Sequence, residues 1–170
     1  MTQSLQWLNQ LSAEDAEAEF LKCCGSKNWA RQMTTARPFA SFDRLAAEAD
    51  RVWWSLSGQD WLEAFRAHPK IGEKKAASVQ AEQAQSWSAK EQAGVSTAST
   101  DTIQALAKLN SAYEGRFGFI FIVCASGKSS REMLEILKTR MRNDPATELR
   151  IAAEEQRKIM FLRLEKLLNQ

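Results

Sequence analysis

The chain has 170 residues, with 23 Lys and Arg against 21 Asp and Glu, so its formal net charge is +2. This near-balance excludes an electrostatic case for binding nucleic acid or an anionic membrane. With 44% hydrophobic residues but only seven Gly and three Pro, the composition excludes a disordered chain and disfavours a turn-rich β-sandwich. We expect one compact domain over residues 1–170.

The cysteine content predicts a reducing compartment. Cys23, Cys24 and Cys124 lack CxxC spacing, and with a single histidine they do not resemble a structural zinc site, so no metal is expected. No secretory signal is visible at the N-terminus, and the apolar stretch 117–125 is far shorter than the roughly 20 residues that cross a bilayer. We therefore predict a cytoplasmic protein without membrane contact.

Serine-led capping patterns predict helices in the first part of the chain, because a serine side chain can bond the free amides of a helix's first turn. The predicted helices cover about 12–24, 41–56 and 57–68. Pro69 ends the last of these, because the residue before a proline is disfavoured in the α region. His68 is therefore expected at a helix terminus.

The second part of the chain also has helical periodicity. We predict short helices within the polar region 72–100, a helix over 103–117, another over about 130–142, and a last one over 144–168. Residues 117–125 have the aromatic and β-branched composition of a strand, but no second strand is predicted to pair with them. The predicted fold class is all-α, with one buried extended segment over about 117–125.

His68 is the first candidate for chemistry. It is the chain's single histidine, and histidine has an unperturbed pKa near neutrality. The following Pro69 restricts the backbone beside it, which would hold the imidazole in one orientation. A lone histidine at a helix end is often a structural cap, and it can also be a general acid or base. The residues alone leave both interpretations open.

Ser88 and Glu91 have the spacing of a capping box, which predicts a helix that starts at Ser88. The same arrangement has a functional interpretation. Amides at a helix start bind anions, and a carboxylate there can orient a neighbouring imidazole or accept a proton.

Arg163 lies on the apolar stripe of the last predicted helix, between Ile159 and Leu167. Such an arginine usually extends its guanidinium group into water. If it is buried, it needs an acidic partner or a carboxylate ligand.

These residues occur within an ordered set of motifs. The set comprises His68-Pro69-Lys70-Ile71-Gly72, Ser88-x-x-Glu91-Gln92, Leu109-Asn110-x-x-Tyr113-x-x-x-Phe117-Gly118-Phe119-x-Phe121, Arg140-x-x-Asn143, Glu148, and Ile159–Leu164 with Arg163. Over about Phe42–Leu168 the chain resembles the 2-oxo-4-hydroxy-4-carboxy-5-ureidoimidazoline (OHCU) decarboxylases, which complete the conversion of urate to (S)-allantoin. Two positions depart from the family pattern: Ile120 stands where proline is frequent, and Lys70–Lys74 is more basic than usual.

The resemblance implies an all-helical, cofactor-free enzyme that acts on a small ureidoimidazoline and is commonly a homodimer. His68 matches the proposed general acid or base of the family, and Glu91 matches the glutamate that cooperates with it. The residues that match substrate-lining positions are Pro69, Ser88, Gln92, Phe121, Ile122, Val123, Cys124, Ala125 and Arg163.

A mechanism consistent with this resemblance needs proton transfer and oriented hydrogen bonds, because a neighbouring carbonyl can delocalise the electron pair that CO2 loss leaves behind. His68, oriented by Glu91, would assist the loss of CO2, and the sequence leaves open which of the two moves the proton. Backbone amides of Phe121–Ala125 would hold the developing charge. A non-catalytic helical binding module and another cofactor-free acid–base lyase or hydrolase remain alternative interpretations.

Overall fold

The computed structural model describes residues 3–71, 82–95 and 99–169, and every regular element within these ranges is a helix. The predicted all-α fold class is confirmed. Among the helices so described, none combines the length and the apolar character that a membrane crossing requires.

The chain divides into two compact units, and each is described by itself. Unit 1 comprises Met1–Ala64 and Arg157–Gln170, and unit 2 comprises Phe65–Gln156. The helices of unit 1 are α1 (Gln3–Gln10), α2 (Ala13–Cys23), α3 (Lys27–Thr35), α4 (Phe42–Ser55), most of α5 (Gly58–Arg66) and the last part of α9 (Pro145–Leu168).

Serine side chains start three of the helices of unit 1, as predicted. The hydroxyl of Ser12 accepts a hydrogen bond from the backbone N–H of Asp15 at 3.0 Å, at the start of α2. At the start of α4, Ser41 accepts from the N–H of Arg44 at 3.2 Å. Ser57 accepts from an N–H of the first turn of α5. Each bond satisfies an amide that lacks a partner within its own helix.

The sequence patterns do not predict α1 and α3. Both helices are short, with 8 and 9 residues, so their apolar periodicity extends over little more than two turns. Three residues separate the end of α2 from the start of α3, and the last of them, the cap Ser26, accepts from the N–H of Trp29 at 3.2 Å.

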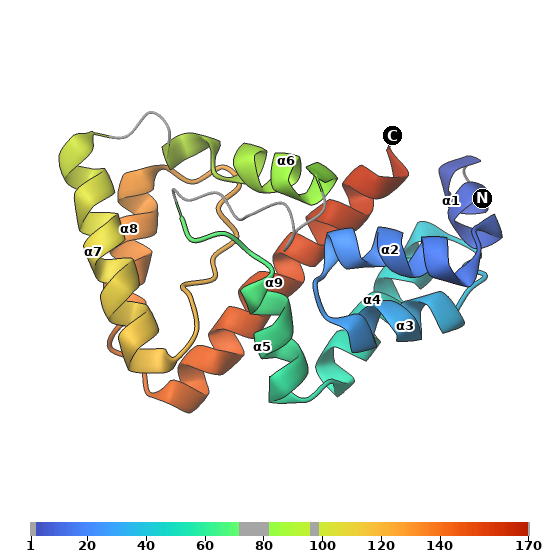
Figure 1. Cartoon of the computed structure of the whole chain (residues 1–170), viewed down its shortest axis with the longest axis horizontal. Helices are drawn as coiled ribbons and strands as arrows, with labels where there is room; N and C mark the ends of the chain where they lie inside the picture. The colour runs from blue at the N-terminus through green and yellow to red at the C-terminus, as the bar shows by residue number, and fades with distance from the viewer. Residues whose placement is uncertain (1–2, 72–81, 96–98, 170) are drawn as a thin grey trace. The chain divides into compact units, whose positions relative to one another are not determined.

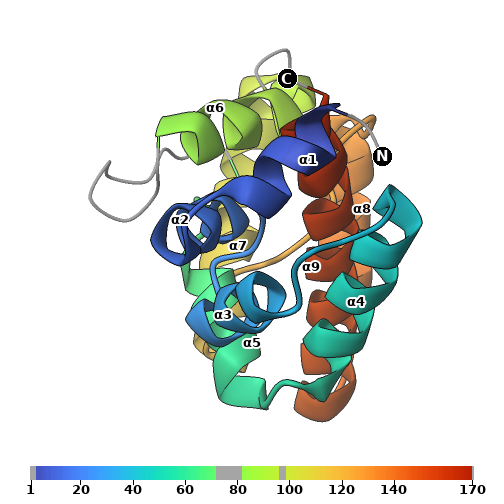
Figure 2. The same ribbon diagram turned by 90° about the vertical axis from the view of Figure 1, so that its right-hand side faces the viewer.

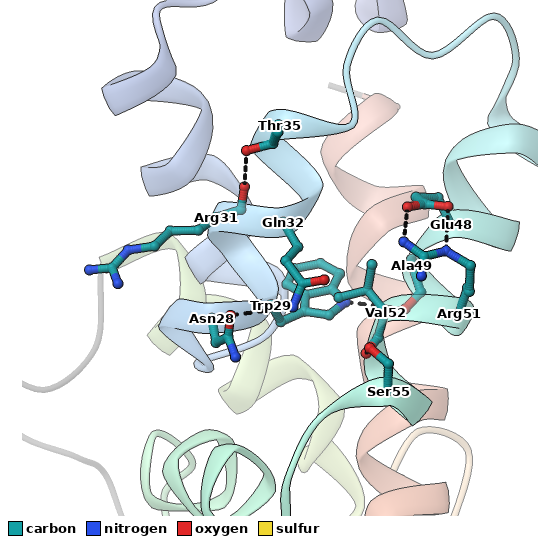
Figure 3. Close-up of polar contacts among 10 residues, drawn as sticks. All are labelled: Asn28, Trp29, Arg31, Gln32, Thr35, Glu48, Ala49, Arg51, Val52 and Ser55. Carbon is teal, nitrogen blue, oxygen red and sulfur yellow. Dashed lines mark hydrogen bonds and ion pairs between the residues drawn. The ribbon is translucent and has the colours of Figure 1, made fainter.

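Trp29 lies in the core of unit 1 and is fully buried. Its ring meets that of Phe20 edge-on, with the centroids 5.8 Å apart. Its indole Nε1 donates to the carbonyl oxygen of Ala49 on α4 at 3.2 Å, as Figure 3 shows. Helices α2 and α3 pack against each other (Figure 2). Trp29 therefore connects α3 to both of its neighbours in the unit.

Unit 2 starts at the end of α5. It contains α6 (Glu82–Glu91), the short 3-10 helix η1 (Ala93–Val95), α7 (Thr100–Phe117), α8 (Ser130–Arg140) and the first part of α9. Helices α7 and α8 lie side by side, and Figure 1 shows the chain between them returning along their length without forming a helix.

The helices predicted in the second part of the chain are confirmed as α7, α8 and α9. The short helices predicted within 72–100 are present as α6 and η1, whereas 72–81 and 96–98 lie outside the described residues. Ile103, where the predicted helix begins, is 41% exposed, because the buried face of α7 runs through Leu106, Asn110 and Tyr113.

The buried extended segment is also confirmed, with a corrected start. Phe117 is the last residue of α7, and Gly118 ends the helix with a positive φ of 80°, which glycine adopts without a steric penalty. Residues 121–125 are all buried and belong to no helix. Their aromatic neighbours include Tyr113, whose ring centroid lies 5.5 Å from that of Phe121. We call residues 119–125 the extended segment.

Candidate active site

His68 is placed by its backbone and by a residue of α9. It follows the end of α5, where its N–H donates to the carbonyl oxygen of Phe65 at 3.1 Å, so the predicted position at a helix terminus is confirmed. Its side chain is buried, and its Nε2 lies 2.7 Å from Oε1 of Gln156, which is fully buried. Pro69 is buried beside it.

The extended segment is bound by the neighbouring residue of α9. The backbone N–H of Cys124 donates to Oε1 of Glu155 at 3.4 Å, and both residues are buried. Because Glu155 and Gln156 are adjacent in α9, one turn of this helix binds both the histidine and the extended segment.

Glu91 also lies near this segment. Burial raises the pKa of the Cys124 thiol, the ammonium group of Lys128 lowers it, and the carboxylates of Glu155 and Glu91 raise it. Side chains from the end of α6 and from α9 therefore both lie close enough to the extended segment to act on Cys124. The result is a buried group of polar and ionisable side chains around Cys124.

The capping box predicted at Ser88 and Glu91 is wrong. Helix α6 starts at Glu82, so Ser88 lies within it and Glu91 is its last residue. The carbonyl oxygen of Ser88 accepts from the N–H of Gln92, as expected near a helix C-terminus. Both side chains are buried on the face that also carries Ala84 and Trp87. The expected anion site at a helix start is therefore absent from this position, although serine and glutamate do face the interior together.

A buried ion pair supports the extended segment from the side of α8. Arg140 lies 5% exposed at the end of α8, and its Nε donates to Oε1 of the fully buried Glu148 on α9 at 2.6 Å. Its Nη1 donates to the carbonyl oxygen of Ile122 at 2.5 Å. The guanidinium group also lies 4.7 Å from the ring centroid of Phe121. Arg140 therefore fixes both the backbone and a side chain of the segment.

Asn143 and Tyr113 complete the hydrogen bonding of Glu148. Asn143 donates to Oε2 of Glu148 at 3.0 Å, and the hydroxyl of Tyr113 donates to Oε1. Arg140 donates to the Tyr113 oxygen at 3.3 Å. Burial raises the pKa of Tyr113 above its usual range, the charge of Arg140 opposes this, and Glu148 reinforces it. Tyr113 therefore stays a neutral donor at physiological pH.

The turn after the extended segment is held by two contacts. Nζ of Lys128 donates back to the carbonyl oxygen of Cys124 at 2.6 Å. The carbonyl oxygen of Lys128 itself faces Gly94 in η1, where the Cβ of any larger residue would collide with it. This close approach explains why a glycine follows the Ser88–Gln92 motif.

Arg163 belongs to unit 1, where it is 3% exposed, so the usual extension into water is wrong for this residue. Its Nη1 donates to the carbonyl oxygen of Lys22 at 3.1 Å, at the end of α2. A cation at this position suits the partial negative charge of a helix C-terminus. Burial raises the pKa of Cys24 to about 12, and the charge of Arg163 lowers it.

The comparisons with known proteins agree with the motifs. The model of the OHCU decarboxylase family matches residues 9–165. The chain belongs to the OHCU decarboxylase family. It is 30% identical over 162 residues to the 2-oxo-4-hydroxy-4-carboxy-5-ureidoimidazoline decarboxylase of Haloferax volcanii, covering 95% of this chain and 94% of that protein.

Other relatives are longer. The chain is 41% identical over 160 residues to the uric acid degradation bifunctional protein TTL of Arabidopsis thaliana, covering 94% of this chain and 49% of that protein. It therefore spans about half the length of that relative, and it spans 32% of the uric acid degradation bifunctional protein of Bacillus sp. strain TB-90.

Solved structures share the fold. A crystal structure of OHCU decarboxylase in the presence of (S)-allantoin matches with a TM-score of 0.78 and 41% identity, covering 89% of this chain and 98% of that one. An (S)-allantoin synthase matches with a TM-score of 0.72 at 18% identity, which indicates the same fold.

In this member of the OHCU decarboxylase family, unit 2 holds ten of the eleven predicted site residues, and unit 1 holds Arg163. The sequence reasoning missed Glu155 and Gln156, which bind the extended segment and His68. The sequence signal that could have found them is their helical spacing from Arg163, which places these polar residues on the same buried face of α9. Among the residues that the structure describes, no group of three or more His, Cys, Asp and Glu side chains is arranged to hold a metal ion.

Proposed function

We propose that the protein decarboxylates 2-oxo-4-hydroxy-4-carboxy-5-ureidoimidazoline to (S)-allantoin and CO2 during urate degradation. The observation that carries this proposal is the match to the Haloferax volcanii decarboxylase, because the chain covers 94% of that protein. A named decarboxylase therefore has nearly the same extent as this chain. The names of the longer relatives, which refer to uric acid degradation, support the same pathway.

The proposed reaction breaks the bond between the ring carbon and its carboxylate. CO2 leaves, the electron pair is delocalised onto an adjacent unsaturated atom of the ring, and a proton is then delivered to one ring face. We assign the proton transfer to His68 acting with Glu91. Support comes from the burial of both side chains, since acid–base groups removed from bulk water transfer protons in a controlled direction.

We assign substrate contacts to Pro69, Ser88, Gln92, the backbone of Phe121–Ala125, and Arg163. The rigid attachment of the extended segment supports this role, since Arg140 holds the carbonyl of Ile122 and Glu155 accepts from the N–H of Cys124. Preorganised backbone groups stabilise developing charge better than mobile ones, because they need no reorganisation during the reaction.

Assembly as a homodimer and a location in the cytoplasm are part of the proposal. Light scattering after size-exclusion chromatography tests the first: a mass twice that of the 19.2 kDa chain is expected. A mass of one chain at micromolar concentration would contradict it.

The activity is tested by coupling the protein to urate oxidase and hydroxyisourate hydrolase and following the optical activity of the allantoin formed. We expect faster appearance of (S)-allantoin than in the reaction without the protein. Racemic allantoin at the spontaneous rate would overturn the proposal and favour a binding module or a different lyase.

Two variants connect the activity to the site. His68→Asn should abolish turnover while the helical circular dichroism stays unchanged. Glu91→Gln should lower kcat, because it removes the charge that acts with His68. Full activity of His68→Asn would contradict its assignment, and a loss of stability alone in Glu91→Gln would make that residue structural.

A further inference from the structure

An uncharged side chain, that of Gln156, lies within hydrogen-bond distance of the imidazole of His68. Oε1 of Gln156 lies 2.7 Å from Nε2 of His68, and Gln156 is fully buried. We propose that Gln156 is a positioning residue, which holds the hydrogen of the neutral imidazole on Nε2 and leaves Nδ1 as the nitrogen that accepts a proton. This inference rests on the proposed function, since it specifies how His68 performs its acid–base role.

The geometry restricts the imidazole at both ends. The backbone of His68 is fixed by its bond to the carbonyl oxygen of Phe65 and by the following Pro69. The ring is then oriented by Gln156 on α9, which is 88 residues away in the sequence. A carbonyl oxygen only accepts hydrogen bonds, so this contact requires a hydrogen on Nε2. In a neutral imidazole the lone pair is then on Nδ1.

The choice of an amide at this position has a chemical consequence. A carboxylate beside Nε2 would stabilise the imidazolium ion and raise its pKa, whereas an amide oxygen orients the ring without adding charge. The adjacent Glu155 does carry a carboxylate, and its Oε1 accepts from the N–H of Cys124. Of these two neighbours on α9, the uncharged one lies within hydrogen-bond distance of His68.

Charged groups occur on several elements of unit 2. Those that act on Cys124 in the extended segment are Glu91 at the end of α6, Glu155 on α9 and Lys128, and Lys70, two residues after His68, pairs with Glu114 of α7. An uncharged acceptor adds no further charge beside the imidazole, and a neutral imidazole is the form that a general base requires.

Gln156 is also costly for the fold. Within residues 3–71, 82–95 and 99–169, its Nε2 is buried and has no hydrogen-bond partner. A buried donor without a partner disfavours the folded state. An apolar side chain of similar size would pack here without leaving a buried donor unpaired. The presence of glutamine therefore supports a functional role for this position.

The first test needs no substitution. His68 is the single histidine of the chain, so protein labelled with 15N-histidine gives one imidazole spectrum. Long-range 1H–15N correlations of the neutral form identify which nitrogen carries the hydrogen. We expect the hydrogen on Nε2 and the lone pair on Nδ1. A hydrogen on Nδ1 would overturn the proposal.

The second test measures the pKa of His68 by the same spectra. Gln156→Glu should raise it by about one unit or more, because an opposite charge in direct contact favours the imidazolium ion. The matched control is Gln104→Glu, which adds the same charge on the exposed face of α7 and should leave the pKa unchanged. An unchanged pKa in Gln156→Glu, or an equal rise in both variants, would overturn the proposal.

The third test separates positioning from stability. Gln156→Leu keeps a side chain of similar size but has no acceptor, so kcat should fall by about 100-fold, within the usual range of acid–base contributions, with little change in KM. In Gln156→Glu the acid limb of kcat/KM should move to higher pH together with the pKa of His68. A fall in activity that follows the melting temperature alone would make Gln156 structural. A wild-type protein without decarboxylase activity would overturn the proposed function and leave the two spectroscopic results intact.

Discussion

Arg140 donates from Nη1 to the carbonyl oxygen of Ile122 at 2.5 Å while its Nε donates to Glu148 at 2.6 Å. The shape of the extended segment therefore depends on an ion pair that is almost completely removed from water. The pair is stable in the interior because Asn143 and Tyr113 satisfy the remaining acceptor positions of Glu148. Residues outside the proposed substrate contacts thus control the backbone that we assign to the substrate.

Removing one member of this ion pair should be costly. Arg140→Met leaves the carboxylate of Glu148 buried without its cation, and we expect a loss of about 3–5 kcal/mol in the free energy of unfolding. Urea titration followed by circular dichroism measures it. The double variant Arg140→Met with Glu148→Met should recover much of this stability, since it leaves no buried charge, but not the activity. A loss of stability in the double variant equal to the sum of the losses in the two single variants would contradict this account.

The pH dependence of Tyr113 gives a second prediction. Its pKa is raised in the folded state, so its contribution to stability is complete below the ordinary tyrosine value of about 10 and is lost as the pH rises further. Tyr113 is the only tyrosine, so phenolate absorbance reports on it alone. We expect this absorbance to appear only together with the loss of helical circular dichroism. Ionisation near pH 10, a value typical of free tyrosine, in a fully helical protein would disprove it.

Two glycines provide a matched pair of substitutions. Gly94→Ala should destabilise the protein and lower activity, because the new Cβ would collide with the backbone carbonyl of Lys128 after the extended segment. Gly115 lies within α7 with open space around it, so Gly115→Ala should stabilise the protein by about 0.5–1 kcal/mol. Thermal unfolding of both variants checks the contrast. Equal effects at the two positions would show that the close approach at Gly94 is unimportant.

Arg163 has a structural bond and a proposed contact with substrate. Arg163→Met keeps the apolar stem but removes the donor to the carbonyl oxygen of Lys22, so we expect a loss of about 1–3 kcal/mol in stability. If the guanidinium group also binds substrate, KM should rise at temperatures where the variant is fully folded. Reduced stability with an unchanged KM would remove Arg163 from the substrate site.

The parts of the fold that depend on local signals are predictable from the sequence. Ser12 and Ser41 start helices because a capping bond acts within one turn, and Asp144 accepts from the N–H of Thr147 at the start of α9 in the same way. The extended segment is predictable because its residues have strand composition without a partner strand, whereas its predicted start at 117 is two residues earlier than the start after Gly118.

The same local signals fail at the site. The spacing of Ser88 and Glu91 equals about one helical turn, so it fits the interior of a helix as well as its start. In the structure both residues lie in the last turn of α6, with their side chains buried. Glu155 and Gln156 bind partners 31 and 88 residues away, which no local pattern encodes. Arg163 is bonded to a backbone carbonyl 141 residues away, and its burial follows from that tertiary contact.

The aromatic residues are distributed unequally between the two units. Trp7, Trp29, Trp53, Trp54 and Trp61 belong to unit 1, whereas Trp87 and Tyr113 belong to unit 2. Tryptophan fluorescence is therefore dominated by unit 1, while the near-ultraviolet spectrum of the lone phenol reports on unit 2. Recorded during one denaturant titration, the two optical signals measure whether both units melt in a single cooperative transition.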